Sequence, residues 1–494
     1  MKYIIVIDQG TTSTRAIIFT SSGEIAGQAQ QEFKQIYPEP GYVEHNPIDI
    51  LSSVRSVIST ALTEARVKYS DILALGITNQ RETVIMWDKQ TGEPIYNAIV
   101  WQCRRTANRC LELEKQGLEK MIQKKTGLRL DSYFSASKIE WLLQNVKEAK
   151  ELYTQHRLLV GTVDTYLLWQ LSGGKIFKTD YTNASRTMLF NIHTLNWDEE
   201  LCSLFHVPMD ILPEVCPSSH IYGKTDKEIL GFEIPIAGVA GDQQSALFGQ
   251  CCFDKGDLKV TYGTGCFLLM NSKEEALESK NGLITSLNCQ TSKGMPSYVL
   301  EGSVFVGGAV IQWLRDELKI IESASQTEQI ARSVADTNGV YLVPAFVGLG
   351  APYWNFNAEG IITGITRGTT KAHIVRAALE GIAFEFNDVI EAMKKDLGVD
   401  ILTIEVDGGA VANSFLMEFQ ADITNAMIAR PKNKEVTALG AFYLAALQMN
   451  LFESLEEIKQ KNPIEKTFIP RMEKELREEK LSAWAKAIRK ASME

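Results

Sequence analysis

Chemical groups that bind phosphate are concentrated between Asp8 and Arg15. Gly10 lets the backbone turn tightly there, so that successive N–H groups can converge on an anion. Hydroxyl side chains follow Gly10, and the guanidinium of Arg15 suits phosphate oxygens. The carboxylate of Asp8 stands at the end of an apolar run, where it could hold Mg²⁺ through water. A plain hairpin turn could carry the same polar residues, so this segment alone leaves both interpretations open.

A second turn of the same kind runs from Thr261 to Gly265. Its glycines and threonines could cradle phosphate oxygens in the same way. Read alone, the segment is equally typical of a glycine-rich hairpin. The presence of one such turn in each half of the chain favours a nucleotide phosphate chain held between two lobes.

A candidate general base follows the apolar run 235–240, which is typical of a buried strand. Asp242 stands there beside a glycine and two glutamines. A sugar-type hydroxyl is a poor nucleophile until its proton is removed, and a well-placed carboxylate can accept that proton. The alternative is an Asp that caps the helix expected from about Gln243.

A candidate polyol site begins with Arg81 and Glu82, at the end of another apolar run. Adjacent opposite charges can hydrogen-bond neighbouring hydroxyls, one by donating and one by accepting. The aromatic faces of Trp101, Tyr133 and Phe267 could cover the carbon chain of a polyol. A surface ion pair and three core aromatics would have the same spacing, so the sequence alone does not decide.

A third glycine-rich segment runs from Asp407 to Asn413. Gly408 and Gly409, after a strand and before a helix, allow a flat or charged ligand to approach the backbone closely. Asn413, one helical turn further, could face an adenosine. A tight strand-to-helix turn without a ligand would look the same.

The signatures of several other enzyme classes are missing from the sequence. A Walker A loop ending at Lys224 fails because Ser218 occupies the place of its first glycine. A dinucleotide fingerprint starting at Gly263 fails because Leu268 occupies the place of its third glycine. The protein-kinase motifs H-R-D and D-F-G, the G-x-S-x-G elbow and the H-E-x-x-H motif are absent as well.

The elements that must position these residues alternate between strands and helices, which indicates an α/β architecture. The N-terminal residues favour three short strands separated by turns, a helical spacing of apolar residues follows, and a buried strand then leads to Arg81. The expected ranges are strands over 3–8, 14–19, 24–33 and 72–78 and a helix over 48–68.

A similar opening appears past the middle of the chain, with strands expected over 257–262, 266–270 and 402–406. This weak internal repeat predicts two related α/β lobes with a cleft between them. The tail is rich in Lys and Glu, which is typical of a solvated helix. The predicted domains are an N-terminal lobe over 1–250, a C-terminal lobe over 251–450 and a helical tail over 451–494.

The bulk composition excludes some classes of protein. The net charge of -10 argues against a nucleic-acid binder that relies on bulk positive charge. The 8 cysteines form no C-x-x-C and no spacing typical of zinc, so we expect reduced thiols. No signal-peptide pattern and no apolar run of membrane-span length occurs, and we therefore expect a cytoplasmic protein.

Taken together and in this order, the segments resemble the glycerol kinases, a branch of the FGGY carbohydrate kinases in the sugar-kinase/actin/Hsp70 superfamily. The resemblance extends from Tyr3 to about Met449. It implies two ribonuclease-H-like lobes that close over their substrates. The motifs that carry it are Asp8–Ser13, Asn79–Thr83, Trp101–Arg105, Tyr133–Ser135, Gly241–Gln244, Tyr262–Phe267 and Asp407–Asn413.

The resemblance also implies a reaction, the ATP-dependent phosphorylation of glycerol to sn-glycerol 3-phosphate, as the entry step of glycerol catabolism. Asp242 would be the general base, Asp8 would lie near Mg²⁺, and the chain would form a homo-oligomer, either a dimer or a tetramer. Glycerol would be bound by Arg81, Glu82, Trp101, Tyr133, Asp242, Gln243 and Phe267. ATP would be bound by Thr11, Thr12, Ser13, Arg15, Thr264, Gly308, Gln312, Gly409 and Asn413.

Two other functions stay open. A kinase of the same family could act on a ketose, a pentulose or gluconate, although the Arg-Glu pair and the three aromatics suit a small triol better. An ATPase of actin or Hsp70 type would share the phosphate turns but would need no polyol pocket. A substrate panel separates the first alternative, and polyol-independent ATP turnover or filament formation would indicate the second.

Overall fold

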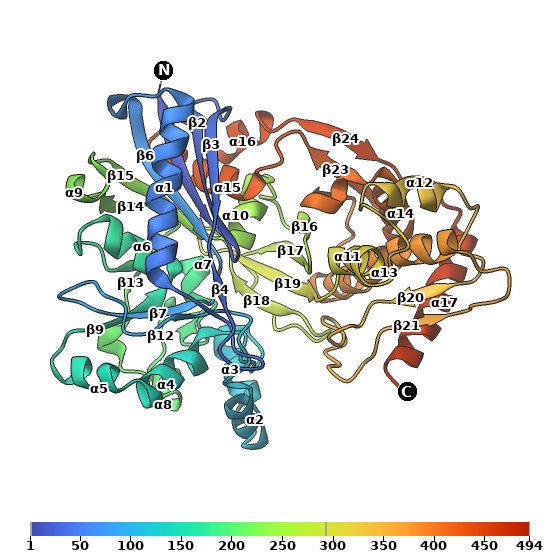
Figure 1. Ribbon diagram of the computed structural model, residues 1–494, viewed down its shortest axis with the longest axis horizontal. Coiled ribbons are helices and arrows are strands. Elements are labelled where there is room, and N and C mark those ends of the chain that lie inside the picture. The colour runs from blue at the N-terminus through green and yellow to red at the C-terminus, as the bar shows by residue number, and fades with distance from the viewer. Residues whose placement is uncertain (1, 292–293, 494) are drawn as a thin grey trace.

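Two mixed β-sheets form the centres of two lobes in the computed structural model, which describes residues 2–291 and 294–493 (Figure 1). In the first sheet, the first three strands of the chain pair antiparallel with one another. The strand β6 pairs parallel with the first of them, and β15 pairs parallel with β6. The strand order is β14-β15-β6-β1-β2-β3. The strands are β1 (Tyr3–Gln9), β2 (Ser13–Thr20), β3 (Ile25–Glu32), β6 (Ile72–Asn79), β14 (Ser219–Lys224) and β15 (Pro235–Gly241).

The second sheet repeats this arrangement in the order β18-β19-β17-β16-β22-β23-β24. Strands β16, β17 and β19 are antiparallel, and β22 and β23 follow parallel to β16. The predicted α/β fold with two ribonuclease-H-like lobes is confirmed, and the weak repeat in the sequence reflects it. The strands are β16 (Leu258–Tyr262), β17 (Cys266–Lys273), β18 (Ile284–Leu287), β19 (Tyr298–Val304), β22 (Thr403–Asp407), β23 (Met427–Pro431) and β24 (Ile464–Phe468).

Helix α1 (Pro47–Ala65) covers one face of the first sheet because its apolar residues recur at helical spacing. Val54 and Ile58, for example, are buried among the strand residues. Asn46 caps the helix by accepting a hydrogen bond from the N–H of Ile48 at 3.0 Å. The chain turns left-handed at Arg66, which ends the helix before the predicted residue 68.

Helix α15 (Val436–Gln448) packs on the opposite face of the first sheet, although it comes from the C-terminal half of the chain. It crosses α10 (Asp242–Gly249) so closely that side chains are excluded from the contact. A Cβ on Gly249 would lie 2.0 Å from the carbonyl oxygen of Val436, and a Cβ on Gly440 would lie 1.8 Å from that of Ser245. The range 251–450 therefore does not pack as one unit, because α15 packs as part of the first lobe. The residue range of each lobe stays a prediction.

The C-terminal tail is more than the helix expected over 451–494. It contains β24, which pairs antiparallel with β23 and extends the second sheet. Helix α17 (Lys474–Ala491) then packs on the second lobe through Trp484, which stacks on Phe384 with ring centroids 5.0 Å apart. A short strand stabilised by pairing with a distant edge has no local signal, so the expectation of a helical tail was wrong for this segment.

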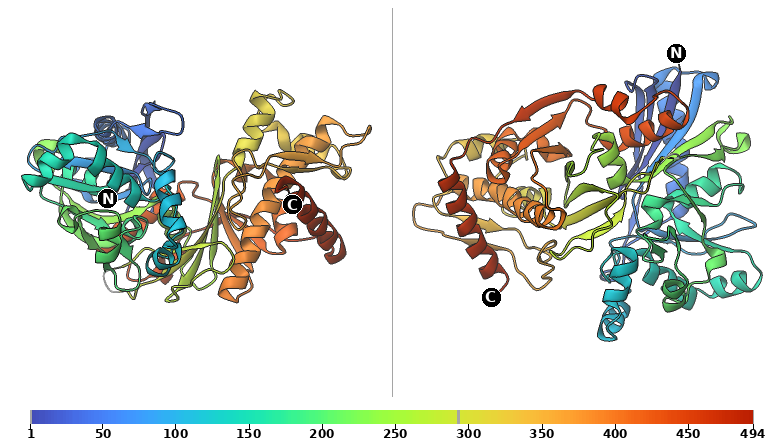
Figure 2. Two further views of the ribbon diagram at one scale, coloured as in Figure 1. Left: turned by 90° about the horizontal axis from the view of Figure 1, so that it is seen from below. Right: turned by 180° about the vertical axis from the view of Figure 1, so that it is seen from behind.

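A small five-stranded sheet and its helices extend the first lobe, below the first sheet in the view of Figure 1 and again when seen from behind in Figure 2. Its strand order is β4-β5-β8-β7-β9. Trp101 follows one of these strands and Tyr133 precedes helix α4, so this region carries two predicted polyol residues. The elements are β4 (Gln35–Ile36), β5 (Glu44–His45), β7 (Val84–Asp88), β8 (Ala98–Ile99), β9 (Leu158–Thr162) and α4 (Ser135–Asn145).

Further helices connect the strands along the chain. No helix within residues 2–291 and 294–493 has the length and apolar character required to cross a membrane. The other longer helices are α2 (Ala107–Lys115), α3 (Glu119–Thr126), α5 (Lys147–Thr154), α6 (Val163–Leu171), α8 (Glu199–Leu204), α11 (Gly308–Asp316), α12 (Gln326–Arg332), α13 (Lys371–Leu397), α14 (Ser414–Thr424) and α16 (Leu455–Gln460).

Candidate active site

Arg81 lies where the first lobe meets the second. Its Nη1 and Nη2 atoms donate to the two carboxylate oxygens of Glu301 at 2.7 and 3.0 Å, and only 2% of its side chain is exposed. Glu301 belongs to β19 of the second sheet, so this bidentate ion pair joins the lobes. The Nη1 atom also donates to Oε1 of Gln244 at 3.0 Å. The guanidinium is therefore fixed in one plane, with its Nε 3.3 Å from Oδ1 of Asp242.

Glu82, the next residue, adopts a left-handed backbone conformation with a φ of 62°. Such a conformation costs a non-glycine residue about 1–2 kcal/mol, so the surrounding contacts must hold it. Arg186 supplies one of them by donating from Nε to Oε1 of Glu82 at 2.5 Å. Its Nη2 also donates to Oε1 of Glu301 at 3.2 Å. Two arginines and two glutamates thus form one buried network at the junction of the lobes.

Opposite charges determine the ionisation of this network. Burial alone would raise the pKa of Glu301, but the guanidinium groups of Arg186 and Arg81 lower it to about 2. Burial raises the pKa of Glu82, although the same two arginines oppose the shift. Glu301 therefore stays ionised at neutral pH and holds Arg81 in place.

Asp242 is the first residue of helix α10, and 29% of its side chain is exposed. The helix N-cap is Gly241, so Asp242 does not occupy the capping position that the sequence offers as an alternative. Burial raises the pKa of Asp242, while Arg81 and Lys259 oppose that shift. A partly exposed carboxylate beside a fixed cation can accept a proton from a bound hydroxyl.

The backbone just before Asp242 is anchored in the first lobe. The N–H of Gly241 donates to Oγ1 of Thr182 at 2.8 Å, and the Thr182 hydroxyl donates to the carboxylate of Asp180 at 2.7 Å. Asp180 is fully buried and caps the short helix α7 (Tyr181–Ala184). Together with the close packing of α10 on α15, these bonds determine where the Asp242 carboxylate lies.

The three predicted polyol aromatics lie together. The rings of Trp101 and Tyr133 meet edge to face at 5.5 Å between centroids, and those of Trp101 and Phe267 do so at 6.4 Å. Trp101 also donates from Nε1 to Oγ1 of Thr11 at 3.0 Å, which connects the aromatic cluster to the first phosphate turn. The buried Lys138 donates from Nζ to the carbonyl oxygen of Tyr133 at 2.7 Å and so holds the loop that carries this ring. The three aromatic side chains and the first predicted phosphate turn are therefore in direct contact.

The first predicted phosphate turn is closed by a hydrogen bond from the N–H of Gly10 to the carbonyl oxygen of Ser13 at 2.9 Å. Two amide side chains brace it from outside. Gln30 donates to Oγ of Ser13 at 3.0 Å, and Gln80 donates to the carbonyl oxygen of Gly10 at 3.1 Å. Thr12 is exposed, so its hydroxyl and backbone are accessible to a ligand.

The second predicted phosphate turn is surrounded by other glycine segments. The N–H of Gly308 donates to the carbonyl oxygen of Gly263 at 2.8 Å. Gly408 has a φ of 94°, and a Cβ at this position would lie 2.4 Å from the carbonyl oxygen of Tyr262. Thr264 is exposed at the tip of the turn. Three chain segments therefore bring bare backbone to one place, as the binding of a phosphate chain requires.

The other predicted nucleotide residues come from both lobes, and several already contact protein groups. Arg15 pairs through Nη1 with Oε2 of Glu435 at 2.8 Å. Asn413 is the N-cap of α14 and donates from Nδ2 to Oγ1 of Thr327 at 3.1 Å. Gln312, on α11, is exposed. Their contacts with ATP stay a prediction.

Asp8 is the carboxylate that the sequence associates with Mg²⁺. Burial raises its pKa to about 7, Arg15 opposes the shift, and the carboxylates of Asp242 and Glu435 add to it. A divalent cation relieves such repulsion between carboxylates, so these oxygen donors fit Mg²⁺. Within residues 2–291 and 294–493 no group of three or more His, Cys, Asp or Glu is placed to hold a metal. A cation bound here would therefore take most of its ligands from water and phosphate.

Sequence reasoning missed three charged residues of this junction: Glu301, Arg186 and Lys259. Lys259 is fully buried on β16 and donates from Nζ to Oε1 of Gln243 at 2.5 Å. A single charged residue inside an apolar strand is a signal that could have found Lys259 and Glu301, because a buried charge needs a partner. Arg186 lies in none of the motifs that predict the site.

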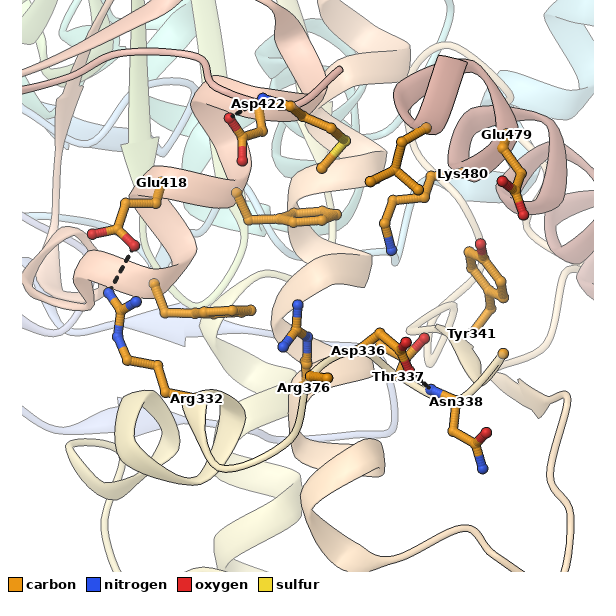
Figure 3. A pocket seen from close by; sticks show the side chains of 16 residues that line it. Arg332, Asp336, Thr337, Asn338, Tyr341, Arg376, Glu418, Asp422, Glu479 and Lys480 are labelled. Carbon is orange, nitrogen blue, oxygen red and sulfur yellow. Dashed lines mark hydrogen bonds and ion pairs between the residues drawn. The ribbon is translucent and has the colours of Figure 1, made fainter. Parts of the chain in front are cut away.

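A separate cavity of about 800 Å³ opens on the second lobe (Figure 3). It lies among α12, α13, α14 and α17, and its cations are engaged in ion pairs. Arg332 pairs with Glu418 at 2.8 Å, and Arg376 pairs with Glu380 at 2.8 Å. None of the predicted glycerol or nucleotide residues lines it, so it is distinct from the predicted site.

Comparisons with known proteins identify the family. The model of the N-terminal domain of the FGGY family of carbohydrate kinases matches residues 3–249, and that of the C-terminal domain matches residues 258–449. The glycerol kinase of Clostridium botulinum is 55% identical over 490 residues, which cover 99% of this chain and 98% of that protein.

Two solved structures are similar over almost the whole chain. The crystal structure of Plasmodium falciparum glycerol kinase with ADP has a TM-score of 0.95 at 39% identity and covers 99% of this chain and 98% of its own. A xylulose kinase from Lactobacillus acidophilus shares the fold, with a TM-score of 0.88 at 24% identity and the same coverage of 99% and 98%. The predicted resemblance is thus confirmed, and this chain belongs to the FGGY family of carbohydrate kinases.

Proposed function

We propose that this chain is an ATP-dependent glycerol kinase, which transfers the terminal phosphoryl group of ATP to a primary hydroxyl of glycerol and yields sn-glycerol 3-phosphate. One observation carries the proposal: the partly exposed carboxylate of Asp242 lies 3.3 Å from the immobilised guanidinium of Arg81. A base and a fixed cation at this distance can act on one small polyol. Relatives that are 55% identical over 490 residues and are named glycerol kinases support the choice of substrate.

The polyol half of the reaction follows from the side chains at the lobe junction. Asp242 accepts the proton of the attacking hydroxyl, which typically contributes a rate factor of about 10²–10⁴. Arg81 donates to a hydroxyl oxygen, and Glu82 accepts from a neighbouring hydroxyl. The aromatic wall of Trp101 and its neighbours covers the carbon chain and keeps water from competing as the phosphoryl acceptor.

The phosphate half of the reaction uses the two turns. Backbone N–H groups and the hydroxyls of Thr12 and Thr264 hold the phosphate oxygens and orient the terminal group for in-line transfer. Asp8 would hold Mg²⁺ through water, and the cation would supply positive charge that neutralises the transferring group. Because the turns belong to different lobes, closure of the lobes brings the nucleotide and the polyol together.

Family resemblance extends the proposal to the state of the protein in the cell. We expect a cytoplasmic homo-oligomer, either a dimer or a tetramer. Light scattering on the purified protein at the concentration used for assays measures its mass directly, and a monomer would contradict this part of the proposal.

An ATP-coupled assay over glycerol, dihydroxyacetone, erythritol, xylulose and gluconate tests the proposal. We expect the highest kcat/KM with glycerol and little ATP turnover without a polyol. A higher value with xylulose or gluconate would indicate another FGGY kinase. ATP turnover that is independent of any polyol would indicate an ATPase of actin or Hsp70 type.

A further inference from the structure

Lys259 is buried, and burying a lysine costs free energy of folding unless its ammonium group has a charge or hydrogen-bond partner. It is fully buried and is the second residue of β16. Its neighbours Leu258 and Val260 point into the core of the second lobe, so Lys259 and Thr261 share the opposite face of the strand, which α10 contacts. Burial lowers the pKa of Lys259, while Asp407 and Asp242 oppose the shift. This lysine is therefore a cation of the second lobe directed at the helix that begins with Asp242.

The contacts of Lys259 determine the orientation of an amide. Its Nζ donates to Oε1 of Gln243 at 2.5 Å and to Oγ1 of Thr261 at 2.7 Å. A lysine ammonium has donors only, so the Gln243 atom that faces it must be the amide oxygen. The amide nitrogen of Gln243 then faces away from Lys259. Since Gln243 is partly exposed, its two N–H groups are available to a ligand.

We propose that Lys259 is a positioning residue of the polyol site, which orients the Gln243 amide so that this residue presents only N–H donors to the substrate. A ligand at this point must offer an oxygen acceptor, as a hydroxyl does, and a methyl or methylene group there leaves the donors unpaired. The inference rests on the proposed function, because it assigns the donors to glycerol. It adds a positioning residue from the second lobe, to which the predicted glycerol residue Phe267 also belongs.

The same geometry links substrate recognition to the contact between lobes. Gln243 belongs to α10, which follows β15 of the first sheet and packs mainly against α15, and Lys259 belongs to the second sheet. The amide is oriented only while the two lobes are in contact at this point. Without Lys259 the amide could rotate, and its N–H donors would face the substrate for only part of the time.

The variant Lys259→Met tests the proposal, because it keeps the length of the side chain and removes the donors. Its matched control is Lys255→Met, since Lys255 is exposed and pairs with the surface residue Glu275. We expect the glycerol KM of Lys259→Met to rise about tenfold, as for the loss of one well-placed hydrogen bond. The ATP KM should stay within about twofold, and the control should match the wild type. An equal rise in both KM values would overturn the proposal, because it would indicate a structural role.

A double-mutant cycle with Gln243→Ala shows whether Lys259 affects the glycerol KM through Gln243. When Gln243 is already truncated, Lys259→Met should change the glycerol KM by less than about twofold. A full tenfold rise in this background would show that Lys259 acts through another group, such as Asp242, and would overturn the proposal.

Substrates that lack one hydroxyl give a second test. If Lys259 were only structural, Lys259→Met would change the KM of every substrate alike. Propane-1,2-diol and propane-1,3-diol each lack one hydroxyl of glycerol. For the diol that lacks the oxygen facing Gln243, the wild type and Lys259→Met should have the same KM. If Lys259→Met raised the KM of glycerol and both diols by the same factor, the proposal would be wrong.

A further variant covers the case in which Lys259→Met fails to fold. Gln243→Glu keeps a partner for Lys259 but has no N–H to present, so its glycerol KM should also rise about tenfold. An unchanged glycerol KM would overturn the proposal.

The wild type in the same assay shows whether the proposed function or only the role of Lys259 fails. If it does not phosphorylate glycerol, the proposed function fails; if it does and the variants behave like it, only the role of Lys259 fails.

Discussion

The two predicted phosphate turns occupy equivalent places in the two sheets but are held in different ways. The first turn, between β1 and β2, is braced by side chains. Trp101 donates to Thr11 at 3.0 Å, and Gln30 donates to Ser13 at 3.0 Å. The second turn, between β16 and β17, depends on missing side chains. A Cβ on Gly307, for example, would lie 2.1 Å from Sγ of Cys266.

This difference indicates how each turn responds to substitution. Removing one brace from the first turn leaves the others in place, so the loss should be gradual. Adding one methyl group to the glycine cluster around the second turn forces backbone segments apart, because protein interiors have no spare volume at such contacts. The second lobe should therefore be the more sensitive half of the predicted nucleotide site, although both turns have similar sequences.

The largest effect is expected for Gly408→Ala. The new methyl group would overlap the carbonyl of Tyr262, which lies 2.4 Å from its position, and the φ of 94° disfavours any side chain. Overpacking costs about 1–3 kcal/mol and the left-handed backbone about 1–2 kcal/mol. We expect a fall of about 2–5 °C in the thermal unfolding midpoint and at least a tenfold rise in the ATP KM. A variant as stable as the wild type would remove the proposed difference between the turns.

Gly409→Ala is the matched control for Gly408→Ala, because it adds the same methyl group at the neighbouring glycine. Apart from its chain neighbours, no heavy atom of the residues that the structure describes lies within 4 Å of the position of its Cβ, so the protein itself can accommodate the methyl group. We expect an unchanged unfolding midpoint and an ATP KM raised about tenfold, because the methyl group would enter the space of the nucleotide. The glycerol KM should not change. An unaltered ATP KM would show that Gly409 does not approach the nucleotide.

A smaller effect is expected at the first turn for Trp101→Phe, which removes the bond to Thr11 and keeps an aromatic ring. The loss of one hydrogen bond costs about 0.5–1.5 kcal/mol, which corresponds to a rise of about two- to tenfold in the ATP KM. Thr11→Val should have a similar effect, and the double variant should be no worse than either single one. Additive effects would mean that the two residues act independently and that the brace contributes nothing.

Local motifs in the sequence were sufficient to find the turns and the residues that flank them. Asp8, Arg81 and Asp242 each stand at the end of an apolar strand, and strand ends of one α/β sheet meet at one edge. The fold class followed from the same alternation of strands, turns and helices. These features are encoded within a few residues and need no tertiary information.

Partners from distant segments could not be predicted in this way. Glu301 and Lys259 look like isolated charges in apolar strands until the sheet register places both on the face that meets Arg81. The return of α15 to the first lobe depends on Gly440, whose role appears only when α10 lies against it. Strand β24 likewise exists because β23 offers an edge to pair with. In each case the decisive contact joins residues that no local pattern connects.

The most direct test of the proposed mechanism is the variant Asp242→Asn. The amide keeps the shape of the carboxylate and one of its acceptor oxygens but cannot accept the proton of glycerol. Turnover and glycerol binding should be measured on the same preparation, by the coupled assay and by calorimetry. We predict that kcat falls about 10²–10⁴-fold while the glycerol Kd changes only a few-fold. A variant that retains kcat within a few-fold of the wild type would contradict the assignment of Asp242 as the general base.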